Sequence, residues 1–332
     1  MRCARIKAST ETGHSIYHVL SRTVNGAFLL DDPAKETLRR QLWQVADYCG
    51  LEILTFALMS NHFHVLVRVP QSTPIPDSEL LRRYQVLYPK PTRFQEARLE
   101  VVQSWLTSGD PEGVTWRKRQ LALMGDVSQF MKLLKQRFSV WFNRTHNRYG
   151  TLWAERFKSV LVEPKDKVVE TIAAYIDLNA VRAGLVTDPK DYRFCGYSEA
   201  VAGGTKARLG LSKILSGESS IGWEQAQAMY RLTLFGVGAA ARPGEGTVSQ
   251  EQLETVVKNN GRLPKHVVLR CRLRHFTDGA VIGGQTFVAE HLAAYSTHTG
   301  RRRKSAPKAL PSLTDWGVDL LTLRGLRHKA AG

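Results

Sequence analysis

The sequence has few cysteines, no long apolar run and no phosphate-binding loop. Its cysteines are Cys3, Cys49, Cys195 and Cys271, and none forms a Cys-x-x-Cys pair, which argues against a disulfide framework and a thiolate zinc site. No stretch reaches the roughly 18 apolar residues of a transmembrane helix, and the first residues lack the apolar core of a signal peptide. We therefore expect a reducing cellular interior and no membrane partner.

Acidic residues are also scarce relative to basic ones. The 332 residues include 47 Lys+Arg and 30 Asp+Glu, which gives a net charge of +17. Hydrophobic residues make up 43%, enough for a sizeable core, and the length predicts about two domains. A chain this basic is usually attracted to polyanions, and without a membrane segment nucleic acid is the favoured one. The alternative is a basic surface with no role in recognition.

The first two hundred residues alternate between strand and helix patterns. Residues 15–24 are β-branched and aromatic and run into Asn25-Gly26, which predicts a strand that ends in a turn. The later patterns predict a helix over 34–48 after Asp31-Asp32-Pro33, paired strands at 51–58 and 62–69, a helix at 127–144, a strand at 151–162 and a helix from Asp166 to near Gly184. This β-α-β-β-α-β order, followed by one more helix, predicts an α+β fold with a ferredoxin-like antiparallel sheet.

Two stretches fall outside this order. Residues 71–125 contain five prolines, which predicts a partly helical insertion. Beyond residue 200, loose Gly-rich stretches separate helical patterns at about 222–234, 249–258, 265–274 and 285–295, with a weak helix-turn-helix signal around 277–279 and a basic RRRK at 301–304. We therefore expect a first domain over 1–200 and a mainly helical, basic region over 201–332, which is a candidate for an extra DNA-binding domain.

Two histidines stand two residues apart in a predicted strand. Because side chains alternate along a strand, His62 and His64 should point to the same face. Two imidazoles on one rigid face can bind a divalent metal ion and leave coordination positions open. One core histidine beside one surface histidine is an equally good interpretation of this spacing alone.

Tyr175 and Asn179 are four residues apart on the last predicted helix. This spacing places the phenol and the amide oxygen on one helical face. An amide oxygen is a suitable third ligand beside two histidines, and tyrosine is a known covalent nucleophile. The alternative is a core tyrosine and a residue at the helix end.

Basic and aromatic residues are interleaved between 131 and 160. The cations are Lys132, Lys135, Arg137, Arg144, Arg148, Arg156 and Lys158, against the single acid Glu155, and the aromatics include Trp141, Phe142, Tyr149, Trp153 and Phe157. Such a mixture suits a surface that follows a single strand of nucleic acid and stacks its bases. The alternative is that the aromatics belong to the core and only the cations reach the surface.

Four segments, in this order, resemble the motifs of a known family. FALMSNHFHVLVRVP resembles the M-P-N-H-x-H strand of the HUH single-tyrosine transposases, and YIDLNAVRAGLV resembles their Y-I-x-x-N-P-V-R-A-G-L-V helix. YHVLSRTVNGAFLLDD and LWAERFKSVLV are similar to their first strand and their W-x-x-R-F-K-S strand. Within this superfamily the chain most resembles the REP-associated tyrosine transposases, relatives of the small insertion-sequence transposases. The resemblance covers about 15–70 and 127–198.

The resemblance implies a role for each matching residue. His62 and His64 match the metal ligands, Tyr175 the nucleophile and Asn179 the third ligand, with Mg²⁺ or Mn²⁺ as the metal. Ser60 and Ala180 stand where the family has proline, and the second difference bears on the aim of Asn179. Candidate DNA-binding residues are Arg22, Lys132, Arg156 and Lys158.

The implied activity is a metal-dependent transposase that nicks and rejoins single-stranded DNA at hairpin, REP-like sequences through a 5′-phosphotyrosine intermediate. It needs no ATP, in keeping with the missing G-x-x-x-x-G-K-[ST] loop. We expect the protein in a bacterial cytoplasm, associated with the nucleoid, and a homodimer is an open alternative.

Rival functions remain at this point. One is a non-catalytic, domesticated DNA- or RNA-binding protein, although an RNA-binding sheet would carry aromatics where His62 and His64 stand. Another is a metal-dependent phosphodiesterase that uses water and therefore does not need Tyr175.

Overall fold

The computed structural model describes residues 6–8, 13–92, 95–217, 221–236, 264–271, 273–299, 307–310 and 314–324. Its centre is a sheet of strands β1 (Ser15–Arg22), β2 (Glu52–Leu58), β3 (His62–Val69) and β4 (Lys158–Val162) in the order β2-β3-β1-β4. All three pairings are antiparallel, as in a ferredoxin-like sheet. The predicted fold class and the predicted hairpin of β2 and β3 are therefore confirmed.

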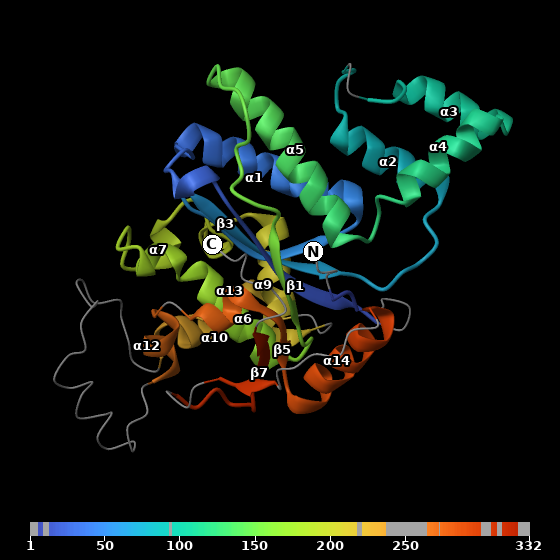
Figure 1. The fold of residues 1–332 in the computed structure, drawn as a ribbon. Helices are drawn as coiled ribbons and strands as arrows, with labels where there is room; N and C mark the ends of the chain where they lie inside the picture. The colour runs from blue at the N-terminus through green and yellow to red at the C-terminus, as the bar shows by residue number, and fades with distance from the viewer. Residues whose placement is uncertain are drawn as a thin grey trace.

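Helices α1 (Asp32–Cys49) and α5 (Val127–Thr145) pack together on one side of this sheet (Figure 1). The carboxylate of Asp31 accepts a hydrogen bond from Ala34 N at 2.8 Å, which caps α1 as the Asp-Asp-Pro signal predicts. On α5, Phe130, Leu134 and Phe138 are fully buried, which confirms the predicted apolar face. Trp141 is half-buried at the edge of that face, so its assignment to the core is only partly right.

The insertion over 71–125 is partly helical, as predicted. It forms α2 (Asp77–Leu87), α3 (Leu99–Ser108) and α4 (Pro111–Leu121), and α2 packs against α1. The rings of Tyr84 and Trp116 meet edge to face at 5.2 Å, so the helices of the insertion share buried contacts. In Figure 1 these helices lie beside α1 and α5.

The other side of the sheet carries α6 (Asp166–Asp177), α9 (Thr205–Ser216) and α10 (Trp223–Phe235). Asp177 is fully buried and accepts hydrogen bonds from Thr55 Oγ1 at 2.8 Å and from Tyr230 Oη at 2.6 Å. These bonds tie the end of α6 to β2 and α10. The short helices α7 (Asn179–Arg182) and α8 (Gly196–Val201) follow, separated by a 3-10 turn at Pro189–Asp191.

The predicted strand over 151–162 is wrong in its first half, because β4 begins only at Lys158. In residues 151–157 the one β-bridge that the structure describes joins Trp153 to Thr23, the residue just after β1. The Trp153 ring packs against Phe63 at 5.5 Å and Phe138 at 5.9 Å, and its Nε1 donates to Lys135 O. These contacts hold the segment in an arch toward α5. Leu152 and Trp153 are buried like strand residues. Ala154 N donates to Arg22 O at 3.0 Å and Leu152 O accepts from Val24 N at 2.9 Å, so the pairing is confined to this short stretch.

The expected helix-turn-helix around 277–279 is also wrong. Helix α13 (Arg274–Asp278) leads straight into strand β5 (Gly279–Gly283), which pairs in parallel with β4. Strands β7 (Leu321–Arg324) and β6 (Lys308–Ala309) continue the same sheet beyond β5. The division near residue 200 stays a prediction, but the later region adds strands to the sheet of the earlier one.

The remaining predicted helices of the C-terminal region have mixed outcomes. The pattern at 265–274 is split into α12 (Lys265–Leu269) and α13, while α14 (Gln285–Thr299) confirms the pattern at 285–295. The patterns at 249–258 and 301–304 lie outside the described residues. Across the described parts of the chain, no helix combines the length and apolar character needed to cross a bilayer.

Candidate active site

A cavity of about 450 Å³ opens where β1, β3, the α6–α7 junction and α13 meet. Seven of the eight residues predicted from the sequence line it: Arg22, His62, His64, Arg156, Lys158, Tyr175 and Asn179. The eighth, Lys132, lies in a neighbouring pocket on α5. The structure thus brings the histidine pair, the tyrosine and the asparagine together, although they come from separate stretches of chain.

The strand register explains how the histidines enter this cavity. His62 is opposite Arg22 on β1, and His64 is opposite Leu20. The two imidazole centroids are 5.1 Å apart at an angle of 87°. His64 is buried and His62 is half-buried, and both line the cavity; burial alone does not decide between a ligand pair and one core histidine beside one surface histidine.

A chain of hydrogen bonds fixes the tautomer of His64. Its Nδ1 is 2.8 Å from His18 Nε2, and His18 Nδ1 is 2.8 Å from Phe276 O. Because a carbonyl only accepts, His18 Nδ1 must carry a proton. Burial lowers the pKa of His18 to about 4, so the ring is neutral near pH 7 and its Nε2 accepts from His64 Nδ1–H. His64 Nε2 therefore keeps its lone pair for a ligand.

His62 has the matching tautomer for a separate reason. Its Nδ1 is 2.6 Å from Asn61 Oδ1, and Asn61 Nδ2 donates to Gly26 O at 3.0 Å. The second bond orients the Asn61 amide, so that its oxygen faces His62 and accepts from Nδ1–H. Both histidines of the pair thus have Nε2 as the nitrogen with a lone pair.

Tyr175 is clamped between a cation and an aromatic ring. The guanidinium carbon of Arg182 lies 3.9 Å from the centre of the phenol ring, and the Phe276 ring meets it edge to face at 5.0 Å. Arg182 also donates to Tyr175 O at 2.7 Å and to Leu269 O at 2.9 Å. Burial lowers the pKa of Arg182 to about 10, which leaves it a cation at neutral pH. The phenol is therefore held in one orientation.

Asn179 lies just beyond the helix interruption at Leu178. Its Nδ2 donates to Ile176 O at 3.0 Å, which fixes the amide and leaves Oδ1 as its second polar atom. Asn179 lines the cavity, and Ala180 is fully buried beside it. The alanine at the position of the family's proline therefore does not remove Asn179 from the site.

The walls of the cavity are strongly basic. Besides Arg22, Arg156 and Lys158, the cations Arg182 and Arg274 line it, against the single carboxylate Glu155. Glu155 is 3.5 Å from Lys158 Nζ at the surface. Such an excess of positive charge favours a phosphate group in the cavity.

Sequence reasoning missed four residues of this site: His18, Arg182, Arg274 and Phe276. His18 and Arg182 stand inside segments that carry the resemblance, so their motifs were a usable signal. Arg274 and Phe276 reach the site because β5 pairs with β4. No local sequence pattern predicts that pairing.

The neutral donors that line the cavity include the imidazoles of His62 and His64 and the amide of Asn179. No group of three or more His, Cys, Asp or Glu side chains suited to a metal ion occurs in the part of the chain that the structure describes. A set of three neutral ligands with open positions fits a divalent cation that also binds phosphate oxygens.

One comparison with known proteins agrees with the motifs of the first part of the chain. The family model described as "Transposase IS200 like" matches residues 12–83, which contain β1, α1, β2 and β3, and confirms the resemblance over this part of the chain. A solved structure described as a REP-associated tyrosine transposase bound to a REP hairpin is similar at 16% identity and a TM-score of 0.33, over 61% of this chain and 87% of that one. A search of curated proteins gave no match.

Proposed function

We propose that this chain, whose residues 12–83 match the IS200-like transposases, is a metal-dependent transposase that cuts and rejoins single-stranded DNA. The observation that carries the proposal is the meeting of His62, His64, Asn179 and Tyr175 in one basic cavity. In the single chain these four residues line the same cavity, and we propose an active site assembled in cis. A homodimer stays a prediction, which sedimentation of the full chain can test.

The proposed metal site uses His62 Nε2, His64 Nε2 and Asn179 Oδ1. A bound Mg²⁺ or Mn²⁺ ion would supply a Lewis acid for the scissile phosphate. The hydrogen bonds to Asn61, His18 and Ile176 support this assignment, because each one occupies the other polar atom of a proposed ligand.

Tyr175 is the proposed nucleophile. Its phenolic oxygen attacks the phosphorus and loses its proton, the bond from phosphorus to the 3′-oxygen breaks, and that oxygen takes up a proton as a 3′-hydroxyl. The product is a 5′-phosphotyrosine, and attack by a 3′-hydroxyl reverses the step and rejoins DNA without ATP. Arg22, Arg156 and Lys158 stabilise the charge on the phosphate.

The proposed substrate is single-stranded DNA beside a hairpin, in a bacterial cytoplasm at the nucleoid. The excess of basic residues supports a DNA partner, and it predicts strong dependence of binding on salt. The similar solved structure is of a protein bound to a REP hairpin, which makes hairpins from repeats the first substrates to test.

The test uses labelled single-stranded oligonucleotides that carry hairpins from the DNA flanking the gene. After incubation with the full chain and Mn²⁺, a denaturing gel should show a covalent protein–DNA band. Tyr175→Phe and EDTA should each abolish it, whereas Tyr149→Phe, the same change at a tyrosine that is 92% exposed, should not. Cleavage that survives Tyr175→Phe would indicate a phosphodiesterase, and binding without any cleavage would indicate a non-catalytic DNA-binding protein.

A further inference from the structure

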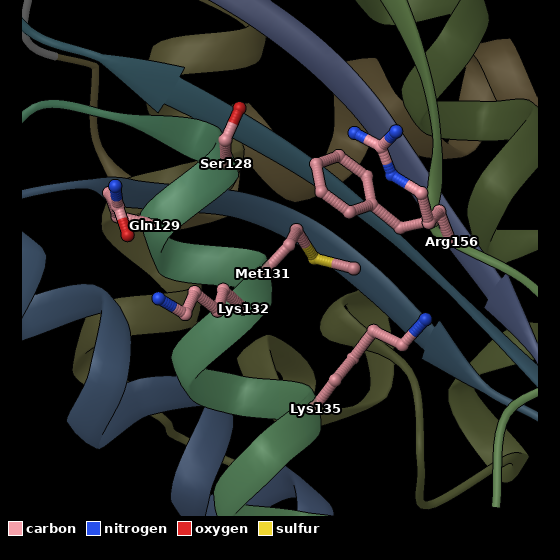
Figure 2. A pocket seen from close by; sticks show the side chains of 7 residues that line it. Ser128, Gln129, Met131, Lys132, Lys135 and Arg156 are labelled. Atoms are coloured by element: carbon pink, nitrogen blue, oxygen red, sulfur yellow. The ribbon is translucent and has the colours of Figure 1, made fainter. Parts of the chain in front are cut away.

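A second cavity, of about 370 Å³, lies beside the active site between α5 and the segment that precedes β4. Figure 2 shows its lining: Ser128, Gln129, Met131, Lys132 and Lys135 come from α5, and Arg156 stands across from them. Phe157 completes the wall on the Arg156 side. We call this cavity the Met131–Phe157 pocket.

The two cavities share one wall. Ala154, Glu155, Arg156 and Lys158 line the active-site cavity, whereas Arg156 and Phe157 line the Met131–Phe157 pocket. This wall is a single stretch of polypeptide, and one strand of polypeptide is roughly 5 Å thick in the plane of a sheet. Neighbouring nucleotides of one DNA strand are at least about 3.4 Å apart along the strand, so they can lie on the two sides of this wall.

The Met131–Phe157 pocket combines an apolar floor with a basic rim. Phe157 is half-buried and keeps an accessible aromatic surface, whereas Met131 is fully buried and only closes the floor of the pocket. Lys135 Nζ donates to Glu155 O at 2.8 Å and lies 5.4 Å from the Trp153 ring centre, which holds its ammonium at the rim. An aromatic beside cations is the combination that stacks a base and attracts its phosphate.

The positive charge of the lysine and arginine side chains in the pocket is not neutralised by other lining residues. No carboxylate stands among its lining residues. Over the described ranges, neither Lys132 nor Arg156 forms a salt bridge or a side-chain hydrogen bond. The positive end of α5 does not supply the attraction, because Asp126 already accepts hydrogen bonds from Ser128 N and Gln129 N. The lysine and arginine side chains are therefore the anion-binding groups.

We propose that the Met131–Phe157 pocket binds one nucleotide of the single-stranded DNA, adjacent to the scissile phosphate. Its base packs on Phe157, and its phosphate lies against Lys132, Lys135 and Arg156. This inference deepens the proposed function and rests on it, because the strand must also enter the cavity of Tyr175.

The test measures binding without chemistry, so that it does not depend on Tyr175 or on a metal. The probe is a fluorescein-labelled oligo(dT) of about 16 nucleotides, at the upper end of single-strand site sizes, titrated with the full chain in EDTA. Phe157→Leu should weaken binding about fivefold or more, because base–aromatic stacking is lost. Phe287→Leu, at a half-buried phenylalanine on α14 elsewhere in the fold, should leave binding within twofold (Figure 1).

A second arm locates the base. A single abasic position is moved along the oligonucleotide, and one position should weaken binding by wild type but have no effect on binding by Phe157→Leu. Lys132→Gln should weaken binding severalfold and Lys118→Gln, at an exposed lysine on α4, should not. Circular dichroism checks that each variant is folded.

The outcomes separate this proposal from the proposed function. Equal binding by wild type, Phe157→Leu and Lys132→Gln, including no binding by any of them, overturns the pocket assignment. The covalent Tyr175 product then still decides the proposed function. Weaker DNA binding by Phe157→Leu and Lys132→Gln, with no covalent product from wild type, would support the nucleotide site and contradict the proposed transposase activity.

Discussion

His18 Nε2 lies 2.8 Å from His64 Nδ1, and through it the backbone carbonyl of Phe276 controls the tautomer of a proposed metal ligand. The contact links three elements that are far apart in the chain: β1, β3 and α13. A residue of this kind does not touch the substrate, but it determines which nitrogen of His64 is available.

Replacing His18 should therefore weaken metal binding. His18→Phe removes the acceptor for His64 Nδ1–H, and losing such a partner typically costs 10- to 100-fold in metal affinity. Isothermal titration of the apo-protein with Mn²⁺ measures this directly. His291→Phe, a histidine on α14, is the matched control, and an unchanged Mn²⁺ affinity in a folded His18→Phe protein would contradict the role of His18.

Arg182 should act on the rate of the covalent step rather than on DNA affinity. Arg182→Lys keeps a cation but cannot both stack on Tyr175 and donate to two carbonyls, so the phenol loses its fixed orientation. We expect the rate of covalent product formation to fall about 10- to 100-fold, since misplaced reacting groups cost about this much. The Kd for DNA in EDTA should change less than twofold.

A matched control is Arg193→Lys, because Arg193 also lies over a ring, that of Phe194 at 5.6 Å, but outside the cavity. Its covalent product should form at the wild-type rate. If Arg182→Lys instead weakens DNA binding and leaves the rate alone, Arg182 contacts the DNA and does not position Tyr175.

Asp177 should make stability depend on pH. Burial raises its pKa from 3.8 to about 7 in the folded protein, so the folded state binds more protons than the unfolded state between these values. Its contribution is fully present below about pH 4 and is lost as the pH rises toward about 7, with a slope of up to about 1.4 kcal/mol per pH unit. Urea unfolding at several pH values, compared between wild type and Asp177→Asn, measures this slope. Parallel curves for the two proteins would refute it.

The salt dependence of DNA binding should identify the phosphate contacts. For single strands, the slope of log K against log salt is about −0.7 for each phosphate contact. Lys158→Gln and Arg22→Gln should each make the slope shallower by about 0.7, and Lys118→Gln should leave it unchanged. Anisotropy titrations in EDTA at several salt concentrations give these slopes. A weaker Kd at an unchanged slope would assign Lys158 or Arg22 a role other than phosphate contact.

The centre of the site could be predicted from the sequence because its spacing is local. The period of two in β3 placed His62 and His64 on one face, and the period of the helix placed Tyr175 near Asn179 even though the helix breaks at Leu178. Lys132, predicted to bind DNA, lines the neighbouring pocket, because it is on α5 and not on the sheet or α6.

The outer parts of the site could not be predicted in this way. Strand β5 has the sequence GAVIG, and glycine is depleted in strands, so its pattern did not predict a strand. Its parallel pairing with β4 joins residues more than a hundred positions apart, and only tertiary packing selects it. Phe276 and Arg274 depend on that pairing for their place.

The carbonyl of Phe276 that binds His18 is synthesised much later than the residues it supports. Phe276 is 101 residues after Tyr175 (276 − 175), so a ribosome adding about 5–20 residues per second makes it roughly 5 to 20 s later. During that interval a nascent chain already has His64 and Tyr175 but lacks the carbonyl that fixes His18. The hydrogen bonds that fix the tautomer of His64 are thus complete only after translation has passed α13.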